Sequence, residues 1–406
     1  MVNTPEIRIA DFSDPWDICK FSNVVTISTE MVDPKTGEFD ELIHIGPGDM
    51  EPESGQLIEG VKTVAESDLI SGKYHFYQDD IVYSKIRPEL AKCVIAPCEG
   101  LSSADAYVLR GNKGEICQSF LYVLLHTEHF YRYSTSVSMR TGMPKINRDE
   151  LGSYVFYAPS LAEQSQIGEL IIALDTLITH HQRKCDELAS LKAYLFQKIF
   201  PKDGERVPEI RFEGYSGDWE QHKVSDLLME RNEQAPMSDK YPLMAFIANE
   251  GVAPKGERYD RSSLVNDSDR KLYKRTKFGD FIYSSNNLET GSIGLNKYGN
   301  ASISPVYSIF QPTGLADSDF IGRRFVRKDF INAMVKWRQG VVYGQWKIHE
   351  SDFLKIEIAV PSIEEQRKIG AFLGNLDNLI TLHRRKCDTF KELKTYLLQN
   401  MFPKED

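Results

Sequence analysis

Two stretches of the chain, one near the middle and one at the C-terminal end, carry apolar residues in alternating steps of four and three. This 3.5-residue period is the pattern of a coiled-coil seam, and it holds for about five heptads. Each stretch therefore predicts one helix of roughly 39 residues, about 58 Å long at 1.5 Å per residue. The first seam consists of Ile167, Ile171, Leu174, Ile178, His181, Cys185, Leu188, Lys192, Leu195 and Ile199. The second consists of Ile369, Leu373, Leu376, Ile380, His383, Cys387, Phe390, Lys394, Leu397 and Met401.

Sequence signals at both ends bound these helices. Ser160-x-x-Glu163 and Ser362-x-x-Glu365 are capping-box patterns that follow a proline, and a further proline follows each helix. A long helix with a single apolar stripe needs a partner to bury that stripe. We expect the two helices to pair with each other, antiparallel, around an approximate two-fold axis.

The two helical stretches belong to an internal repeat. Residues 159–203 and 361–405 align without a gap and share 24 identities in 45 positions. Upstream, Pro5-Glu6-Ile7-Arg8 recurs as Pro208-Glu209-Ile210-Arg211. The Pro/Gly/charged segment 201–206 marks the boundary between the copies. The repeat predicts a first domain over 1–158, a first spacer helix over 159–203, a second domain over 204–360 and a second spacer helix over 361–406.

The regions between the repeated segments are predicted to be rich in β-strands. Strands are expected over 80–84 and 280–284, which match in pattern, and over 92–96 and 304–309. Helices are expected over 120–135 and 329–339. The predicted fold class is α+β, with two pseudo-two-fold-related mixed α/β recognition domains separated by an antiparallel coiled coil of two long helices. Divergent loops on a shared frame are what two different binding specificities would produce.

Composition narrows the class of protein further. The net charge of −10 argues against a simple basic nucleic-acid binder. The acidity is uneven, because residues 1–158 hold 14 Lys+Arg against 24 Asp+Glu and residues 205–350 hold 21 against 20. The six cysteines form no CxxC pair, and no apolar run reaches the ~18 residues that span a bilayer. These features predict a cytoplasmic protein with reduced thiols and no membrane partner.

The duplicated plan resembles the DNA-specificity (S) subunit of type I restriction–modification systems. The segments Pro159-Ser160-Leu161-x-Glu163-Gln164-x-x-Ile167 and Pro361-Ser362-Ile363-x-Glu365-Gln366-x-x-Ile369 resemble the helix openings that follow each target-recognition domain in that family. The segments 142–151 and 344–353, which lead into the helices, and 291–307 also resemble family segments. The order of domain, helix, domain, helix covers the whole chain.

This resemblance implies a non-catalytic subunit that binds double-stranded DNA. Each recognition domain would read one half of a bipartite, asymmetric site, and the helices would set the gap between the half-sites. The helices would also dock two methyltransferase (M) subunits that use S-adenosylmethionine, while restriction (R) subunits would supply chemistry driven by ATP and Mg. No cofactor is expected in this chain. Two heads on a pseudo-dyad should engage major grooves about one turn (~34 Å) apart. Inserting or deleting one heptad in either helix should change the preferred gap.

Basic and amide side chains in the head loops are the candidate DNA contacts. Arginine can fork onto guanine, lysine mostly meets phosphate, and asparagine can pair with adenine. Solvated charges and turn-forming asparagines, including Asn296, are the alternative interpretation. The candidates are Lys85, Arg87, Arg140, Lys145, Arg148, Lys274, Arg275, Lys277, Asn286, Asn287, Arg323, Arg324 and Lys347.

The seam carries two His–Cys pairs near the middle of the helices, His181 with Cys185 and His383 with Cys387. A crossing at the midpoints could bring all four together as a Cys₂His₂ zinc set. A buried polar layer that fixes the register is the interpretation we favour, so no metal is predicted. Beside the seam, the basic clusters 183–184 and 384–386 are either a solvated helix face or a contact to DNA between the half-sites.

Two rival functions remain open. The net charge is compatible with a coiled-coil protein-interaction scaffold that never binds DNA, and a duplicated enzyme with unfamiliar motifs is the other. The sequence has no GxxxxGK[ST] phosphate loop, no [DN]PP[YF] tetrapeptide, no nucleophile elbow and no HExxH. We therefore predict that the chain is not an enzyme.

Overall fold

The structure is a computed structural model that describes residues 4–139, 143–254, 271–286, 288–342 and 345–403. The chain forms two compact units. Unit 1 contains residues 1–184 and 383–406, and unit 2 contains residues 185–382. Each unit therefore combines one α/β domain with part of each long helix.

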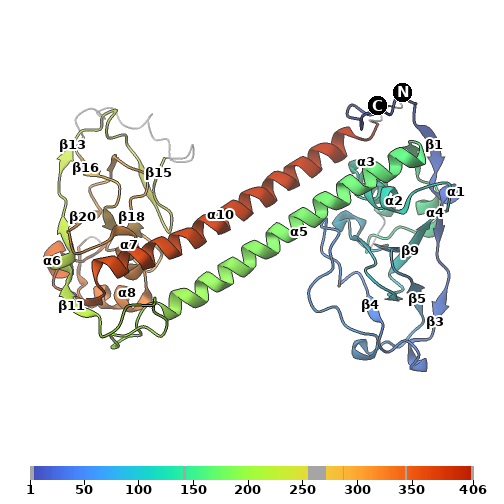
Figure 1. Cartoon of the computed structure of the whole chain (residues 1–406). Coiled ribbons are helices and arrows are strands. Elements are labelled where there is room, and N and C mark those ends of the chain that lie inside the picture. The colour runs from blue at the N-terminus through green and yellow to red at the C-terminus, as the bar shows by residue number, and fades with distance from the viewer. Residues whose placement is uncertain (1–3, 140–142, 255–270, 287, 343–344, 404–406) are drawn as a thin grey trace. The chain divides into compact units, whose positions relative to one another are not determined.

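The first domain holds most of the elements of unit 1. The long helix α5 begins here and continues into unit 2 (Figure 1). The elements are β1 (Asp17–Lys20), α1 (Phe21–Val24), β2 (Val25–Ile27), β3 (Met31–Val32), β4 (Ile43–Ile45), β5 (Lys73–Phe76), β6 (Ile81–Ser84), β7 (Cys93–Ile95), β8 (Gly100–Ser102), β9 (Ala106–Gly111), α2 (Gln118–Leu124), α3 (Glu128–Ser138), α4 (Arg148–Gly152), β10 (Val155–Ala158) and α5 (Leu161–Lys198).

The second domain repeats this order with additional short strands. The long helix α10 begins in unit 2 and ends in unit 1. The elements are β11 (Glu220–Lys223), α6 (Val224–Leu227), β12 (Leu228–Glu230), β13 (Gln234–Ala235), β14 (Ala245–Ile247), β15 (Gly251–Ala253), β16 (Tyr273–Thr276), β17 (Phe281–Tyr283), β18 (Ile293–Leu295), β19 (Ala301–Ile303), β20 (Ser308–Pro312), α7 (Ser318–Phe325), α8 (Lys328–Val335), β21 (Gln339–Val342), β22 (Gln345–Lys347), α9 (Glu350–Phe353), β23 (Glu357–Val360) and α10 (Ile363–Asn400).

The two domains share one sheet topology. The main sheet has strand order β2-β9-β6-β7 in the first domain and β12-β20-β17-β18 in the second. The second sheet runs β3-β5-β8-β4 and β13-β16-β19, respectively. In each domain the strand that enters the domain pairs antiparallel with the strand that leaves it, β1 with β10 and β11 with β23. The prediction of one frame used twice is confirmed.

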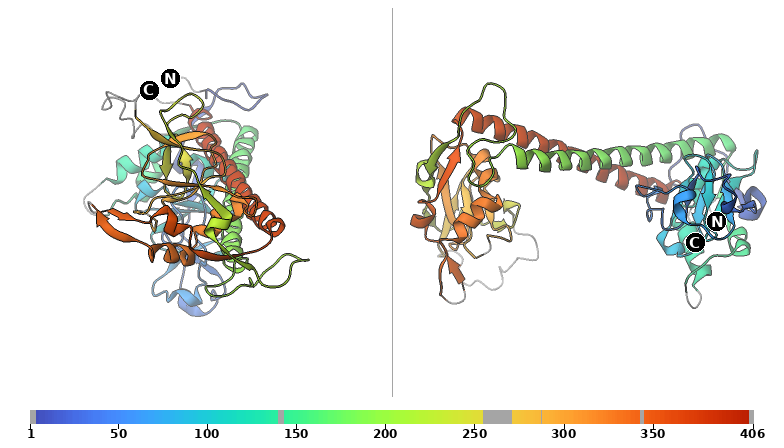
Figure 2. Two further views of the ribbon diagram at one scale, coloured as in Figure 1. Left: turned by 90° about the vertical axis from the view of Figure 1, so that its left-hand side faces the viewer. Right: turned by 90° about the horizontal axis from the view of Figure 1, so that it is seen from below.

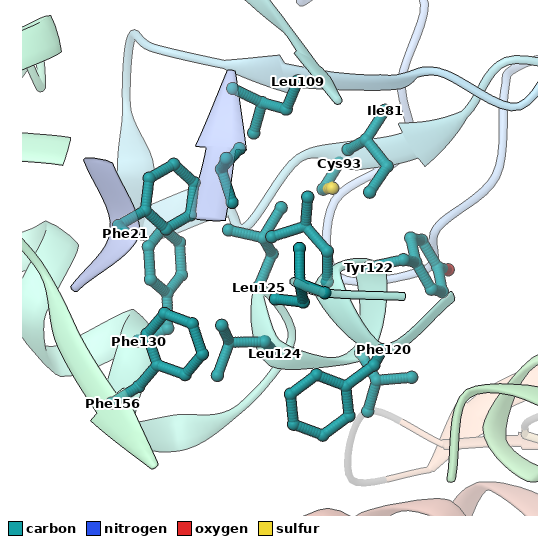
Figure 3. Packing of buried hydrophobic residues seen from close by; sticks show 14 of the residues in the cluster. Phe21, Ile81, Cys93, Leu109, Phe120, Tyr122, Leu124, Leu125, Phe130 and Phe156 are labelled. Atoms are coloured by element: carbon teal, nitrogen blue, oxygen red, sulfur yellow. The ribbon is translucent and has the colours of Figure 1, made fainter. Parts of the chain in front are cut away.

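Each domain is built around an aromatic and aliphatic core. In the first, Phe120 on α2, Phe130 on α3 and Phe156 on β10 belong to one cluster with Leu109 and Ile81 of the main sheet (Figure 3). All of these side chains are at most 2% exposed. The second core uses equivalent positions on α7, α8 and β23. Buried apolar area of this kind contributes about 25 cal/mol per Å² to folding, and this burial stabilises these short helices against the sheet.

The repeated tryptophans tie each domain to a helix end. Trp16 packs edge-on against Phe402, which follows α10, with ring centroids 5.7 Å apart. Trp219 packs in the same way against Phe200, which follows α5, at 6.3 Å. Both indoles are 1% exposed. The Trp and Phe-Pro-Lys positions of the repeat are therefore one packing unit.

The duplicated Glu-Gln pair at each helix opening has a structural role. Glu163 accepts a two-pronged ion pair from Arg8, with both nitrogen–oxygen distances at 2.8 Å, and Glu365 accepts the same from Arg211. Gln164 holds the start of α2 by accepting from the Cys117 amide at 2.8 Å. The capping-box prediction is therefore only half right, because these carboxylates meet arginine while the preceding serines accept from the Glu163 and Glu365 amides.

The long helices run antiparallel within each unit. In unit 1, Lys394 pairs with Asp175 at 2.5 Å and the thiol of Cys387 faces the carbonyl of Ile178. Residue numbers therefore increase along α5 in the direction in which they decrease along α10. In unit 2, Lys192 pairs with Asp377 at 2.5 Å. Both further views keep the two helices side by side in each unit (Figure 2). The predicted antiparallel pairing is confirmed, and the seam residues named above are buried or half-buried.

Three element predictions were wrong in part. The helix expected over 120–135 is split into α2 and α3, because Thr127 accepts from the Phe130 amide and starts a new helix. The strand expected over 304–309 begins only at Ser308, after a turn in which the Tyr307 amide donates to the Ser304 carbonyl. The helix expected over 329–339 ends at Val335, and β21 begins at Gln339.

Candidate nucleic-acid interface

The loop that follows β6 is joined to the segment that leads into α4. The Arg87 amide donates to the Pro144 carbonyl and the Ile146 amide donates to the Lys85 carbonyl, both at 2.9 Å. Arg87 itself adopts a left-handed backbone conformation with φ +49°, which a non-glycine residue adopts only when its surroundings enforce it. The two segments therefore form one fixed loop pair, which we call the strand-end loops.

Four of the candidate DNA contacts meet at these loops. Lys145 and Arg87 are exposed, and Lys85 and Arg148 are half-buried beside them. Burial, followed by the nearby Lys145 ammonium, lowers the pKa of Lys85. The Lys145 ammonium is thus close enough to repel the charge of Lys85. A cationic edge of this kind attracts phosphate even on an acidic chain, because local rather than net charge sets the field at the surface.

Arg148 has a structural task as well. Its guanidinium donates to the carbonyls of Ile27 and Ser28 at 3.0 and 2.7 Å. It also lies over the rings of Tyr74 and Tyr107, 5.6 and 5.2 Å from their centroids. Arg148 therefore fixes the segment that carries Lys145.

The second domain builds the same loop pair with different side chains. The Ile348 amide donates to the Ser285 hydroxyl at 3.0 Å, which joins the loop after β17 to the segment before α9. Lys347 is exposed there and Asn286 is half-buried. Lys274 is only 7% exposed and donates to the Tyr307 carbonyl at 2.9 Å, so its ammonium is turned into the domain.

The remaining basic candidates lie elsewhere and are engaged within the protein. Arg275 pairs with Glu233 at 2.8 Å and covers the Tyr241 ring. Arg323 binds Asp377 of α10, and Arg324 binds Asp329, each at 2.8 Å. Lys277 is exposed, but it lies in the turn before β17, at the opposite end of that strand from Lys347.

The asparagine predictions divide in the same way. Asn296 is fully buried and closes its own turn by accepting from the Tyr298 and Gly299 amides at 2.9 and 3.1 Å. The turn-forming interpretation therefore holds for this residue. Arg140 and Asn287 lie outside the described residues.

The polar layer of the helix pair brings the two histidines together. The Nδ1 atoms of His181 and His383 are 2.9 Å apart, and Phe390 stacks on His181. The Cys185 thiol faces the Ile380 carbonyl, as that of Cys387 faces Ile178. Within the described residues, no group of three or more His, Cys, Asp or Glu side chains could hold a metal ion. The contact between the two histidine Nδ1 atoms is the hydrogen bond of this layer. The neighbouring basic clusters 183–184 and 384–386 are exposed.

Each long helix also exposes an apolar stripe along one flank of the seam. Its leucines each come directly before a seam position, for example Leu177 before Ile178 and Leu379 before Ile380. The stripe, 39–55% exposed, consists of Leu170, Leu177, Leu191 and Tyr194 on α5 and Leu379, Leu382, Leu393 and Tyr396 on α10. We call it the outer stripe. Because contiguous exposed apolar surface marks interaction sites, the outer stripe is a candidate interaction surface.

Sequence reasoning did not single out Tyr74, Tyr107, Glu350 or Asp175. Tyr107 looks like an ordinary core aromatic in a strand, and only the fold shows that it lies beneath Arg148. Asp175 falls outside the apolar period, so its pairing with a seam lysine becomes visible only when the register of the helices is known.

Comparison with known proteins assigns the chain to a family. The model of the type I restriction modification DNA specificity domain matches twice, over residues 17–190 and 218–391. The chain belongs to this family. Because specificity subunits of type I restriction–modification systems are non-catalytic, the family confirms the prediction that the chain is not itself an enzyme.

Individual relatives agree with the family. The specificity subunit of the type I restriction enzyme EcoDI from Escherichia coli is 33% identical over 202 residues, which is 49% of this chain and 44% of that protein. The chain thus spans less than half the length of this relative. The candidate specificity subunit MjaX of Methanocaldococcus jannaschii is 24% identical over 83% of this chain and 80% of its own.

A solved structure supports the fold. The S subunit of a type I restriction–modification system from M. genitalium covers 99% of this chain and 100% of its own, with a TM-score of 0.58 at 13% identity. The predicted fold class and family are confirmed. No helix among the described residues is long and apolar enough to cross a membrane.

Proposed function

We propose that this chain is the DNA-reading subunit of a type I restriction–modification complex, in which each α/β domain reads one half of a split, asymmetric site. The observation that carries the proposal is that one sheet topology occurs twice with different side chains on equivalent strand-end loops. Identical loops would read a symmetric site, whereas unlike loops on like frames read two different half-sites. Methyl transfer and ATP-driven chemistry reside in partner methyltransferase and restriction subunits.

In this proposal the exposed lysines of the loops contact phosphate and orient the domain, while neighbouring side chains meet base edges. Neutralising one phosphate contact reduces the slope of log K against log salt by about one. Lys145→Ala and Lys347→Ala should therefore each weaken binding of the complete methyltransferase complex to DNA and lower the salt slope. Lys113→Ala is the matched control, because Lys113 is exposed in the turn after β9, away from the strand-end loops.

The helix pair provides the spacing between half-sites and the docking surface for two methyltransferase subunits. The outer stripe supports the docking role, because each unit carries a portion of it from both helices. The paired variants Leu177→Glu with Leu393→Glu, in unit 1, and Leu191→Glu with Leu379→Glu, in unit 2, should each remove one of two methyltransferase copies. Native mass spectrometry counts the copies. Ala189→Glu, exposed on the other flank, should leave both bound.

The decisive experiment is a methylation assay of the complete methyltransferase complex on a randomised DNA library. The expected result is a split site with two unlike halves and a fixed gap. If the complex methylates all sequences equally, the DNA-reading proposal fails and the scaffold function gains support.

A further inference from the structure

The two domains place different side chains at four equivalent positions beneath the strand-end loops. β6 pairs Tyr83 with Tyr107 on β9, and β17 pairs Tyr283 with Ser308 on β20. We name these positions the variable cluster. They are Tyr74, Lys85, Tyr107 and Arg148 in the first domain, and Lys274, Ser285, Ser308 and Glu350 in the second.

The equivalence of the other positions follows from backbone pairing. The amides of His75 and Arg275, directly after Tyr74 and Lys274, donate to the carbonyls of Glu30 and Glu233 at 3.0 and 2.9 Å. Arg148 and Glu350 are the first residues of α4 and α9. Lys85 and Ser285 both follow a serine at the end of the central strand.

The frame around the cluster is kept while the cluster changes. Tyr83 and Tyr283 are both buried, and Ile146 and Ile348 are both fully buried. Asp80 and Asp280 both pair with an arginine at 2.8 Å, which is Arg110 of β9 in the first domain and Arg231, directly after β12, in the second. The side chains that support the strand-end loops therefore differ in chemistry between the domains, while these positions of the surrounding frame are kept.

In the first domain, cations on aromatic rings hold the loops. Arg148 lies over both Tyr74 and Tyr107, and the Lys85 ammonium lies 5.6 Å from the Tyr107 ring centroid. Burial raises the pKa of Tyr107, so the ring stays neutral, as attraction of a cation to its face requires. The carbonyls of Ile27 and Ser28 fix the guanidinium from below.

In the second domain, a carboxylate takes the central place. Ser308 donates to Glu350 at 2.7 Å, and Ser285 accepts from the Ile348 amide. Burial alone would raise the pKa of Glu350, but the Ser308 hydroxyl, the Glu350 backbone amide and the nearby Lys274 and Lys347 outweigh it and lower the pKa. The carboxylate is thus charged, and it is attracted to the ammonium of Lys347 in the strand-end loop.

The two sets are not interchangeable residue by residue. A glutamate in place of Arg148 would point its carboxylate at two carbonyl oxygens and two aromatic faces, all of which repel it. An arginine in place of Glu350 would face Lys274. The four positions must therefore change together, as a set that is tuned to each domain.

We propose that the variable cluster determines the half-site specificity of each domain, because it sets the orientation of the strand-end loops that meet DNA. Its members lie in these loops or pack against them and act as positioning residues. This inference rests on the proposed function, and it identifies where within each domain the sequence preference is fixed.

The test transplants the cluster of the second domain into the first. The variant carries Tyr74→Lys, Lys85→Ser, Tyr107→Ser and Arg148→Glu, and its complete methyltransferase complex is assayed on the randomised library. The half-site read by the first domain should change its preferred base by tenfold or more at one position at least. The half-site read by the untouched second domain should stay the same and serves as an internal control.

Three further measurements separate the possible outcomes. Thr127→Ala removes the cap of α3 and lowers stability without touching the cluster, so it should leave both preferences unchanged. If the fourfold variant does not fold, Arg148→Lys keeps the charge but loses the fork to two carbonyls, and it should shift the same half-site. Unchanged preference in a folded variant overturns the inference but not DNA reading. A wild-type complex without any split-site preference refutes the proposed function itself.

Discussion

The repeat places the same interhelical ion pair in two different environments, and this allows a sharp test of how burial sets its strength. Lys394 and Asp175 in unit 1 have side chains only 12% and 9% exposed. Lys192 and Asp377 in unit 2 are 33% and 34% exposed. Both pairs have a nitrogen–oxygen distance of 2.5 Å. The perturbation is Lys394→Met in one variant and Lys192→Met in the other.

The expected costs differ because the aspartate left behind is in a different state. Without Lys394, the buried Asp175 keeps one side-chain partner among the described residues, the Tyr122 hydroxyl at 3.2 Å, and breaking a buried pair in this way costs about 3–5 kcal/mol. Without Lys192, Asp377 keeps Arg323 at 2.8 Å and is partly solvated, so the cost falls to about 1 kcal/mol or less. We expect the two variants to differ by about 2 kcal/mol or more.

The pH dependence of the Lys394→Met variant follows from the same reasoning. Burial already raises the pKa of Asp175, and Lys394 is the charge that opposes this shift. In the variant the folded carboxyl therefore binds its proton at a higher pH than the unfolded carboxyl, whose pKa is about 3.9. The folded state holds more protons in that window, so the penalty is full above the folded pKa and shrinks as the pH falls through it.

The assay is chemical denaturation of the full chain at pH 8 and pH 5, with hydrogen exchange of the helix amides to assign each loss to its unit. The double variant Asp175→Leu with Lys394→Leu should recover most of the stability, because apolar replacement of both partners removes the uncompensated charge. Equal costs for Lys394→Met and Lys192→Met, or a larger penalty at pH 5 than at pH 8, would refute the reasoning.

Three other predictions concern single residues. Arg8→Met should destabilise unit 1 by about 3–5 kcal/mol in denaturant titrations, because it strands a Glu163 side chain that is 1% exposed. Burial and the facing His383 lower the pKa of His181, so the stability from this group is present above the unfolded pKa of about 6.5 and is lost as the pH falls below it. His181→Phe should flatten the stability profile between pH 7 and 5. Gly55→Ala should lower the melting temperature of the chain, because φ is +73° and the new Cβ would lie 1.9 Å from a tyrosine hydroxyl of α2.

The long-range plan could be predicted from the sequence because it depends on periodicity and repetition. The seam from Ile167 to Ile199 buries as its period requires, and the two copies fold into one topology. The repeat also locates residues with a shared task, since Glu163 and Glu365 bind equivalent arginines. The repeat does not reveal which residue binds each glutamate. The capping pattern locates the glutamate at the start of the helix, but tertiary packing determines that its carboxylate binds an arginine.

The candidate interface was predictable only in part, because residue type does not fix exposure. Lys145 and Lys347 are exposed at equivalent loops. Lys274 lies in the strand β16 instead, where its side chain is buried and donates to the Tyr307 carbonyl. Arg323 appeared equally available and instead binds Asp377 on α10. A lysine or arginine in a short strand or helix is placed by the face on which its Cβ falls, and sequence alone does not assign that face here.

The contact at the centre of the helix pair limits which heptad insertions the helices can accommodate. His181 faces His383, which is its own copy in the repeat, so the two helices pair self-complementarily about this contact. The interhelical Asp–Lys pair then occurs twice, once in each unit. A heptad inserted into one helix alone would move His181 away from His383 or leave one Asp–Lys pair unmatched, at the cost of a hydrogen bond or an ion pair. Heptads inserted at facing positions, one between Asp175 and His181 in α5 and one between His383 and Lys394 in α10, keep these contacts and lengthen both helices equally. Paired insertions should therefore change the gap between half-sites without lowering the stability of the chain. Single insertions should change the gap and also lower the stability.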